Sequence, residues 1–226
     1  MSLRLSQTDV LRLSPVGGFN ANNAEAHNCR VYTYDGQIYE GTIQLADASL
    51  HVNKEYSTTQ RTFQSVEVVL DEPVTSKDDV KALGITNGCF VCADPNLVVT
   101  NSGYIKSRFL DDKLSAAILL GYAKYIRENN ITPLRKVYQH MTVFEEVGHG
   151  ACASIPEDVT ELLSVDMGCV GDGLECTERQ VSICAKDGHG PYNYQVTTGL
   201  VNAAKKTALT MLLTFIRSTV LMPMLH

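Results

Sequence analysis

Two neighbouring carboxylates, Glu145 and Glu146, offer the clearest chemistry in this 226-residue sequence. They follow the apolar run KVYQHMTVF, residues 136–144, which has the length and composition of a buried strand. Successive side chains of a straight strand point to opposite faces, so both acids reach one centre only where the strand turns into a loop. Gly148 and Gly150 favour such a turn. Two carboxylates in one pocket could then divide the work, one binding a cation and the other taking a proton from a metal-bound water.

Further acids stand at the ends of other predicted elements. Asp111 and Asp112 precede a predicted helix, and Asp166 follows the apolar run ELLSV. Carboxylate oxygens suit a hard or borderline divalent cation, and one carboxylate often bridges two ions about 3.5–4 Å apart in two-metal hydrolases. Plainer explanations stay open, because either aspartate could cap the helix and the Glu145–Glu146 pair could be a solvated strand end. We predict that Asp111, Glu145, Glu146 and Asp166 converge in space.

Helices and strands alternate in the second part of the chain, which predicts a layered α/β domain. Apolar residues at helical spacing between Leu114 and Tyr125 predict a helix whose apolar face packs on a sheet. Besides the run that leads to Glu145, ELLSVDMG and QVSICAK have the pattern of strands. Further helices are expected near Ala151 and over residues 194–209. The acids would then lie at the ends of the strands, where open α/β sheets carry their sites.

Short alternating strands dominate the first part of the chain and predict a small β-barrel or sandwich. CRVYTY and QIYEGTIQL flank a hairpin turn at Asp35 and Gly36, and FQSVEVVL follows a polar loop. Residues 76–84 contain a capping box and a terminating glycine, which predict a short helix. The change of pattern places a domain boundary near residue 92, between a β domain at 1–92 and an α/β domain at 93–226.

Charge and cysteine usage narrow the class of protein. The net charge is −6 and no basic run occurs, which argues against a nucleic-acid backbone as partner. No apolar segment follows a basic start, so we predict a cytoplasmic protein without a membrane partner. The seven cysteines suit reduced, buried thiols, and Cys89 and Cys92 lack the second pair that a zinc finger needs. His140 is expected in the core or in a sheet, whereas His149 and His189 flank the predicted site without a ligand motif.

FLDDKLSAA, TVFEEVGHGA and LLSVDMG follow one another in an order and separation that resembles the glutamyl and tetrahedral (deblocking) aminopeptidases, cytoplasmic enzymes with two catalytic zinc ions. LRLSPVGG and the YDGQIYEGTI hairpin also match, so the likeness runs from Val10 to about Leu209. The resemblance implies a three-layer α/β/α zinc-aminopeptidase fold, incomplete here, with an inserted PDZ-like small β-barrel that forms dimers. It also implies peptide substrates and assembly towards a hollow dodecamer.

By this resemblance, Asp111 would bridge two metal ions and Glu145 would be the general base, while Glu146 and Asp166 would each bind one ion. Zinc is the expected metal, with cobalt or manganese as alternatives. The substrate would be the N-terminal residue of a peptide, with acidic residues as one candidate class. The family's first and last histidine ligands have no counterpart here, so we expect weak metal binding and little or no activity from this chain.

The last 17 residues, 210–226, form an apolar tail. Arg217 and Pro223 interrupt it, and it is too short to span a membrane, so its plainest interpretation is a terminal helix. Back-translation with a shift of one base can give a Ser-Asp-Ala segment like the one expected here in the family. We therefore hypothesise a frameshift after Leu209 that truncates the protein.

Two alternatives to an aminopeptidase stay open. The chain could be a non-catalytic remnant that acts only as a dimerisation module. It could also be a metal-free glycan hydrolase that uses Glu145 with Asp111 or Asp166, which requires carboxylates about 5 Å or 6.5–9.5 Å apart.

Overall fold

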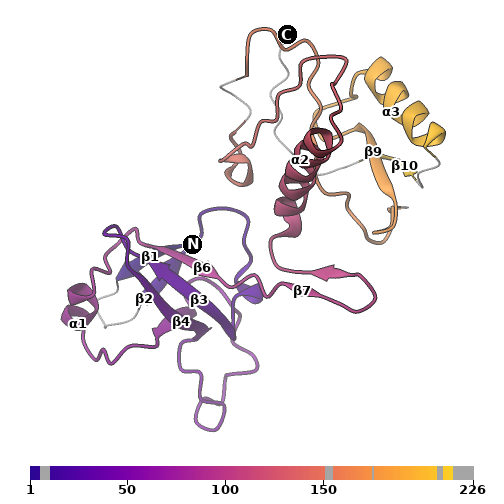
Figure 1. Ribbon diagram of the computed structural model, residues 1–226. Helices are drawn as coiled ribbons and strands as arrows, with labels where there is room; N and C mark the ends of the chain where they lie inside the picture. Colours follow the sequence, from indigo (N-terminus) through magenta and orange to yellow (C-terminus); the bar gives the residue numbers. More distant parts are fainter. Residues whose placement is uncertain (6–10, 151–154, 175, 208–210, 216–226) are drawn as a thin grey trace. The chain divides into compact units, whose positions relative to one another are not determined.

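The computed structural model describes residues 1–5, 11–150, 155–174, 176–207 and 211–215 (Figure 1). The chain divides into two compact units, residues 1–108 and 109–226. This division falls after the predicted boundary near residue 92, so the first unit also contains the short hairpin that follows the last barrel strand. Within the described ranges, no helix combines the length and hydropathy needed to cross a membrane.

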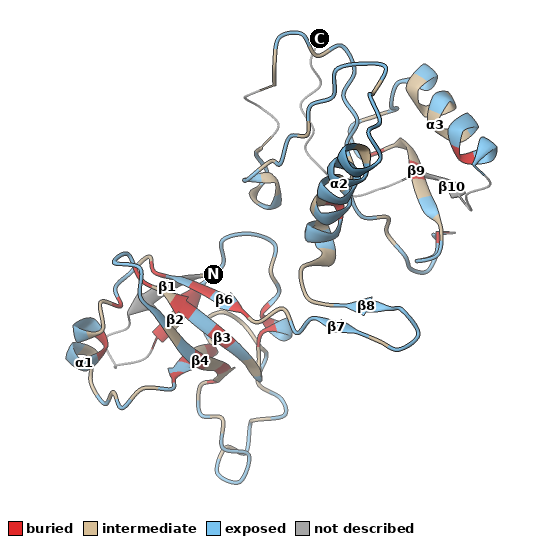
Figure 2. Ribbon diagram, in the orientation of Figure 1, coloured by how far each residue is buried: buried red, intermediate tan, exposed pale blue. Residues whose placement is uncertain are grey.

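Six antiparallel strands close a barrel in the first unit, in the order β1-β2-β5-β4-β3-β6. Alternation fills it: on β3, Cys29 and Val31 are buried while Arg30 between them is exposed (Figure 2). The predicted barrel is thereby confirmed as an architecture, whereas its likeness to PDZ domains stays a prediction. The strands are β1 (Ser2–Leu5), β2 (Leu11–Ser14), β3 (His27–Tyr32), β4 (Ile38–Leu45), β5 (Val66–Leu70) and β6 (Phe90–Ala93).

Local turn chemistry sets the connections of the barrel. Between β3 and β4, Gly36 takes a φ of +86° and the Thr33 N–H donates to the Gln37 carbonyl over 3.0 Å. The Ser76 hydroxyl accepts the Asp79 N–H and caps a short helix, as predicted. The remaining elements of the unit are η1 (Ala21–Asn23), α1 (Lys77–Ala82), β7 (Val98–Val99) and β8 (Ile105–Lys106).

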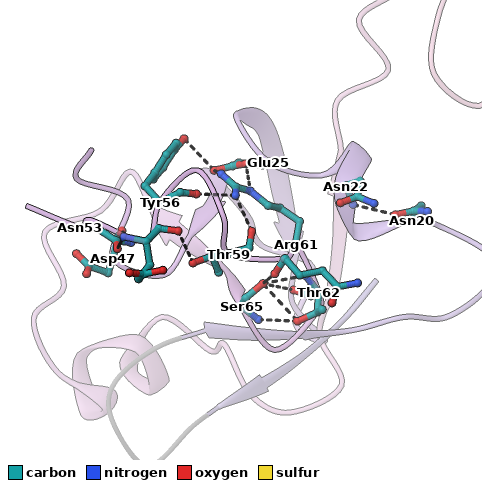
Figure 3. A network of polar contacts seen from close by, with 12 residues as sticks. Asn20, Asn22, Glu25, Asp47, Asn53, Tyr56, Thr59, Arg61, Thr62 and Ser65 are labelled. Carbon is teal, nitrogen blue, oxygen red and sulfur yellow. Dashed lines mark hydrogen bonds and ion pairs between the residues drawn. The ribbon is translucent and has the colours of Figure 1, made fainter. Parts of the chain in front are cut away.

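A polar network holds the long β4–β5 connection, residues 46–65, against the barrel (Figure 3). Arg61 Nε donates to the Glu25 carboxylate over 2.6 Å, and the Tyr56 hydroxyl donates to the same carboxylate over 3.1 Å. Arg61 also donates to the carbonyls of Tyr56 and Thr59, each over 2.7 Å. The hydrogen bond from Arg61 is the main reason that the pKa of Glu25 lies below its ordinary value.

The second unit contains a parallel βαβ arrangement near its C-terminal end. β9 pairs in parallel with β10, and α3 connects them. Asn193 caps α3 by accepting the N–H groups of Gln195 and Val196. The predicted α/β character is therefore confirmed, as are the strand QVSICAK and the helix that begins at Tyr194. The elements are α2 (Leu110–Glu128), η2 (Glu145–Val147), β9 (Val181–Lys186), α3 (Tyr194–Lys206) and β10 (Met211–Phe215).

Two predicted strands are wrong. Residues 136–144 and 161–168 form no strand, and Figure 1 draws both as connecting chain. Their apolar patterns are those of strands, but a strand is stabilised by hydrogen bonds to a neighbour, and neither has a ladder partner among the described residues. The helix expected near Ala151 lies outside the described residues.

The apolar face of α2 is also not covered as expected. The helix forms where helical spacing predicted it, but Leu114, Ile118, Tyr122 and Tyr125 are between 42% and 57% exposed. No sheet packs on this face within the described parts of the chain. In the tail, the interpretation as a terminal helix is wrong for residues 211–215, because they form β10.

Candidate metal centre

The first turn of α2 places two aspartates in different roles. The backbone is not helical at Asp111 (φ −81°, ψ 109°) or Asp112 (φ −119°, ψ 40°), and the peptide bond between them is cis. Asp112 Oδ1 accepts the Ser115 N–H over 3.3 Å, which is the contact of a helix N-cap. The capping role left open by the sequence therefore belongs to Asp112.

Three carboxylates from two distant parts of the sequence meet at this point. Asp111, Asp112 and Asp166 each offer one oxygen, and these oxygens all lie within 4.8 Å of one another. Asp166 belongs to a segment that forms neither helix nor strand, and its Oδ1 accepts the Met167 N–H over 2.6 Å. The structure thus brings together two predicted site residues, Asp111 and Asp166, and adds Asp112.

Glu145 and Glu146 stand on η2, a single turn closed by the hydrogen bond from the Gly148 N–H to the Glu145 carbonyl over 2.9 Å. Burial raises the pKa of Glu145, and the charges of Asp166 and Glu146 raise it further. Burial also raises the pKa of Glu146, followed by the charge of Asp111, while a backbone hydrogen bond from Asp112 partly opposes the rise. Both glutamates therefore lie within electrostatic reach of the aspartate group.

Neighbouring charges also raise the pKa values of the aspartates. Burial and the charges of Asp166 and Asp112 raise the pKa of Asp111. Burial raises the pKa of Asp112, although its hydrogen bonds with Ser115 partly offset this. A divalent cation would relieve this concentration of negative charge, and carboxylate oxygens are the donors that such ions bind. The residues present therefore fit a metal ion.

Two glycines allow the close packing around the acids. A Cβ on Gly168 would lie 2.8 Å from the Ser182 Cβ, so the segment that carries Asp166 runs directly against β9. A Cβ on Gly150 would lie 2.9 Å from the Thr142 Cβ, and Gly150 has a φ of +109°. Gly150 was the visible signal for a turn after the glutamates, whereas nothing in the sequence marked Gly168.

No histidine joins the acid group among the described residues. His140 was expected in the core or in a sheet, but it is exposed and its segment forms no strand. His149 and His189 are exposed as well. As far as the described residues show, the group of possible ligands therefore consists of carboxylates.

Sequence reasoning missed a buried carboxylate after β9. Asp187 is 6% exposed, and its oxygens accept the His189 N–H (2.7 Å), the Gly190 N–H (3.1 Å) and the Tyr192 hydroxyl (3.1 Å). Burial alone would raise the pKa of Asp187, but these hydrogen bonds together lower it. Burial and then Asp187 raise the pKa of Tyr192 to about 12, and the charge of Asp166 contributes to the rise. The only sequence signal was the turn-forming composition of DGHGP.

Comparison with known proteins gives this arrangement its context. Residues 4–220 match the model of the M42 glutamyl aminopeptidase family. The chain belongs to this family. The M42 chain is 41% identical over 196 residues to the protein called "Putative aminopeptidase YhfE" of Bacillus subtilis (strain 168), which covers 87% of this chain but only 57% of that relative. It thus spans little more than half the length of this relative.

Solved structures show the same fold at lower identity. The TET aminopeptidase from the marine sediment archaeon Thaumarchaeota archaeon SCGC AB-539-E09 matches with a TM-score of 0.75 at 17% identity, over 96% of this chain and 64% of that one. PhTET1-12s, described as a dodecamer in the asymmetric unit, matches with a TM-score of 0.73 at 19% identity, over 96% and 65%. The resemblance stated from the sequence is thereby confirmed.

The extent of the match corrects one detail of that resemblance. The family model matches through residue 220, beyond Leu209, the predicted end of the likeness. The prediction that the tail departs from the family at Leu209 is therefore wrong for residues 210–220. The frameshift hypothesis stays a prediction, which the genomic codons of the tail would test.

Proposed function

We propose that this chain carries the acidic residues of a metal-dependent aminopeptidase that removes N-terminal residues from peptides. The observation that carries the proposal is the meeting of carboxylates from the start of α2 and from the segment at Asp166, with Glu145 and Glu146 within electrostatic reach. Membership of the M42 family supports a peptidase rather than a glycan hydrolase. The aminopeptidase activity of the whole protein is part of this proposal, because the chain spans only 57% of the length of its relative YhfE.

The roles we assign follow the chemistry of the donors. Asp111 would bridge two divalent ions, Glu146 and Asp166 would each bind one, and Asp112 would support Asp111 while it caps α2. Zinc is the proposed metal, with cobalt or manganese as alternatives. When bound, the ions would polarise the attacked carbonyl and the attacking water.

Glu145 would act as the general base in this proposal. It would accept a proton from the attacking water and pass it to the amine that leaves. A carboxylate whose pKa is raised holds that proton more readily at neutral pH, and the partial burial of Glu145 acts in this direction. The residue needs no metal ligand role, which leaves its oxygens free for the proton.

Substrate preference and assembly complete the proposal. The family description, glutamyl aminopeptidase, supports a preference for acidic N-terminal residues. PhTET1-12s is described as a dodecamer, which supports a homo-oligomer, and we propose that the barrel unit supplies the dimer contact.

One observation favours the alternative, a remnant that only dimerises. Of the buried apolar residues in the described ranges, 16 lie in the first unit and three in the second. A chain whose only substantial core is the barrel could oligomerise without a working metal centre.

Zinc titration by calorimetry separates the two functions. Asp111→Asn and Asp166→Asn should each weaken zinc binding about tenfold or more, because each removes a charged donor. Asp172→Asn, an exposed acid outside the group, is the matched control and should bind as the unaltered chain does. Glu145→Gln should keep the metal and lose any turnover of aminoacyl anilides. Equal affinity in the unaltered chain and all four variants, with oligomers intact, would favour the remnant.

A further inference from the structure

His27, the first residue of β3, contacts the segment through which the chain leaves the barrel unit. Arg108 Nη2 of the guanidinium donates a hydrogen bond to His27 Nε2. The side-chain amide of Asn96 lies 3.2 Å from the other ring nitrogen, Nδ1. The half-buried imidazole is therefore engaged at both nitrogens by residues that follow β6 in the chain.

Further contacts fix this segment within the first unit. The Arg108 backbone N–H donates to the Pro95 carbonyl over 2.7 Å, and the Ser107 hydroxyl donates to the same carbonyl over 3.0 Å. The guanidinium also lies 5.9 Å from the centre of the Phe19 ring. Arg108 is the last residue of the first unit, and Phe109, the N-cap residue of α2, follows it. These contacts thus hold the point at which the chain passes from the barrel unit to α2.

The hydrogen bond between Arg108 and His27 requires a neutral imidazole. A guanidinium has five N–H donors and no acceptor, so Nε2 can accept from it only while Nε2 carries no proton. The neutral ring then carries its proton on Nδ1, and a half-turn of the Asn96 amide presents an oxygen to that proton. Protonation of Nε2 would remove the acceptor and place two cations against each other.

The surroundings of His27 favour this neutral form. Burial lowers the pKa of His27 below its ordinary value of 6.5, and the charge of Arg108 lowers it further. On β4, the residues opposite and beside the pairing position of His27, 42–44, are uncharged. Two carboxylates on neighbouring segments are paired with other arginines: Asp94 with Arg30 over 3.0 Å, and Glu25 with Arg61 over 2.6 Å.

We propose that His27 and Arg108 form a pH-sensitive latch, in which the neutral imidazole holds Arg108 in the barrel unit and protonation of His27 releases it. Because the pKa of His27 is lowered in the folded chain, the latch is closed above the ordinary value of 6.5 and opens as pH falls through the lower folded value. Release frees the connection to α2 while the barrel strands stay paired. The latch involves neither metal nor substrate, so it does not depend on the proposed function.

Hydrogen exchange of the Arg108 amide in the full chain, followed by NMR, tests the latch, since this amide donates to Pro95. Its protection factor, corrected for the intrinsic effect of pH on exchange, should fall about tenfold between about pH 7.5 and about pH 5. The amides of β5, which pairs with β2 and β4, report opening of the whole barrel and should stay protected. A constant protection factor at Arg108, or one that falls only together with those of β5, would overturn the proposal.

Replacing the histidine separates its titration from a merely structural role. His27→Gln supplies an oxygen that accepts a hydrogen bond but does not titrate, so the variant should lose the pH response of the Arg108 amide. His51→Gln, at an exposed histidine of the same unit, is the matched control and should respond to pH as the unaltered chain does. A response that persists in His27→Gln would assign it to another group and refute the latch.

Replacing the arginine tests the other half of the latch. In Arg108→Met, the amide of residue 108 should exchange at both pH values as fast as it does in the unaltered chain at about pH 5. NMR titration of the His27 ring should also show its pKa rising towards the ordinary value of 6.5, because the neighbouring positive charge is gone. An identical titration of His27 in both chains would show that the ring does not sense Arg108, and the proposal would fail.

Discussion

The barrel and the second unit differ in how completely they pair their strands and bury their apolar side chains. Every barrel strand has a neighbour on both sides, and the side chains that point inward, such as Ile43 and Val66, are fully buried. Among the described residues of the second unit, β9 and β10 pair only with each other, and the apolar side of α2 is exposed. Closing the sheet pairs the backbone N–H and carbonyl groups of every strand and encloses a core. The described part of the second unit, by contrast, holds its acids with few buried apolar residues around them.

The largest test of this contrast is a truncation in each unit. Ile43 is 0% exposed in the barrel, and Ile118 is 55% exposed on α2. Ile43→Ala should lower the free energy of unfolding by about 2–5 kcal/mol, because it opens a cavity. Ile118→Ala should change it by less than about 0.5 kcal/mol. Urea denaturation followed by circular dichroism measures both changes. Equal losses of unfolding free energy would show that Ile118 lies in a core, contrary to the comparison of the two units.

A smaller effect is expected from the network under the β4–β5 connection. Because Glu25→Gln leaves Arg61 its carbonyl partners, it should lower barrel stability by roughly 1 kcal/mol. The pKa of Glu25 is lowered in the folded state, so its contribution is present above its ordinary value of 4.5 and is lost as pH falls through the lower folded value.

Urea midpoints at several pH values check this sign. The gap between the unaltered chain and Glu25→Gln should be widest near pH 6 and should close as the solution becomes acidic. Asp94→Asn, in the more exposed pair with Arg30, is the matched control and should give a smaller gap. A gap that widens towards acid would contradict the assignment.

The glycine beside β9 tests how the second unit positions its acids. Gly168→Ala would place a Cβ 2.8 Å from the Ser182 Cβ and push the Asp166 segment away. We expect cobalt(II) to bind several-fold to about tenfold more weakly, as seen by its visible absorption, while the barrel transition stays unchanged. Gly171→Ala, where nothing lies within 4 Å, is the control. Equal binding by both variants would mean that the packing at Gly168 does not position Asp166.

The smallest effect should follow from removing the second unit altogether. Residues 1–108, expressed alone, should unfold with a urea midpoint close to that of the barrel in the full chain, since the barrel core lies within them. A midpoint that falls clearly, or a loss of cooperativity, would show that the barrel depends on the second unit.

The contrast also explains which features the sequence could predict. The hairpin at Gly36 and the cap at Ser76 were predictable, because each depends on residues within one turn. The strand expected at residues 136–144 was wrong, because a ladder requires a partner that periodicity cannot supply. Asp111 and Asp166, which the structure brings together, were named from the ends of predicted elements, although the strand predicted before Asp166 does not form. The burial of Asp187 and the close approach at Gly168 could not be predicted, since both arise from contacts in the folded chain.

One carboxylate belongs to both the helix start and the acid group. Asp112 caps α2 through the Ser115 N–H and lies within the group of acid oxygens. A bound cation that offsets the charge of the neighbouring carboxylates would favour the ionised form of Asp112, and an ionised aspartate is the stronger helix cap. If an ordered first turn of α2 strengthens the binding of a cation, then by thermodynamic reciprocity the bound cation stabilises that ordered turn by the same factor. The hydrogen-exchange rate of the Ser115 amide would therefore report whether the acid group holds a cation, and it can be measured without any substrate.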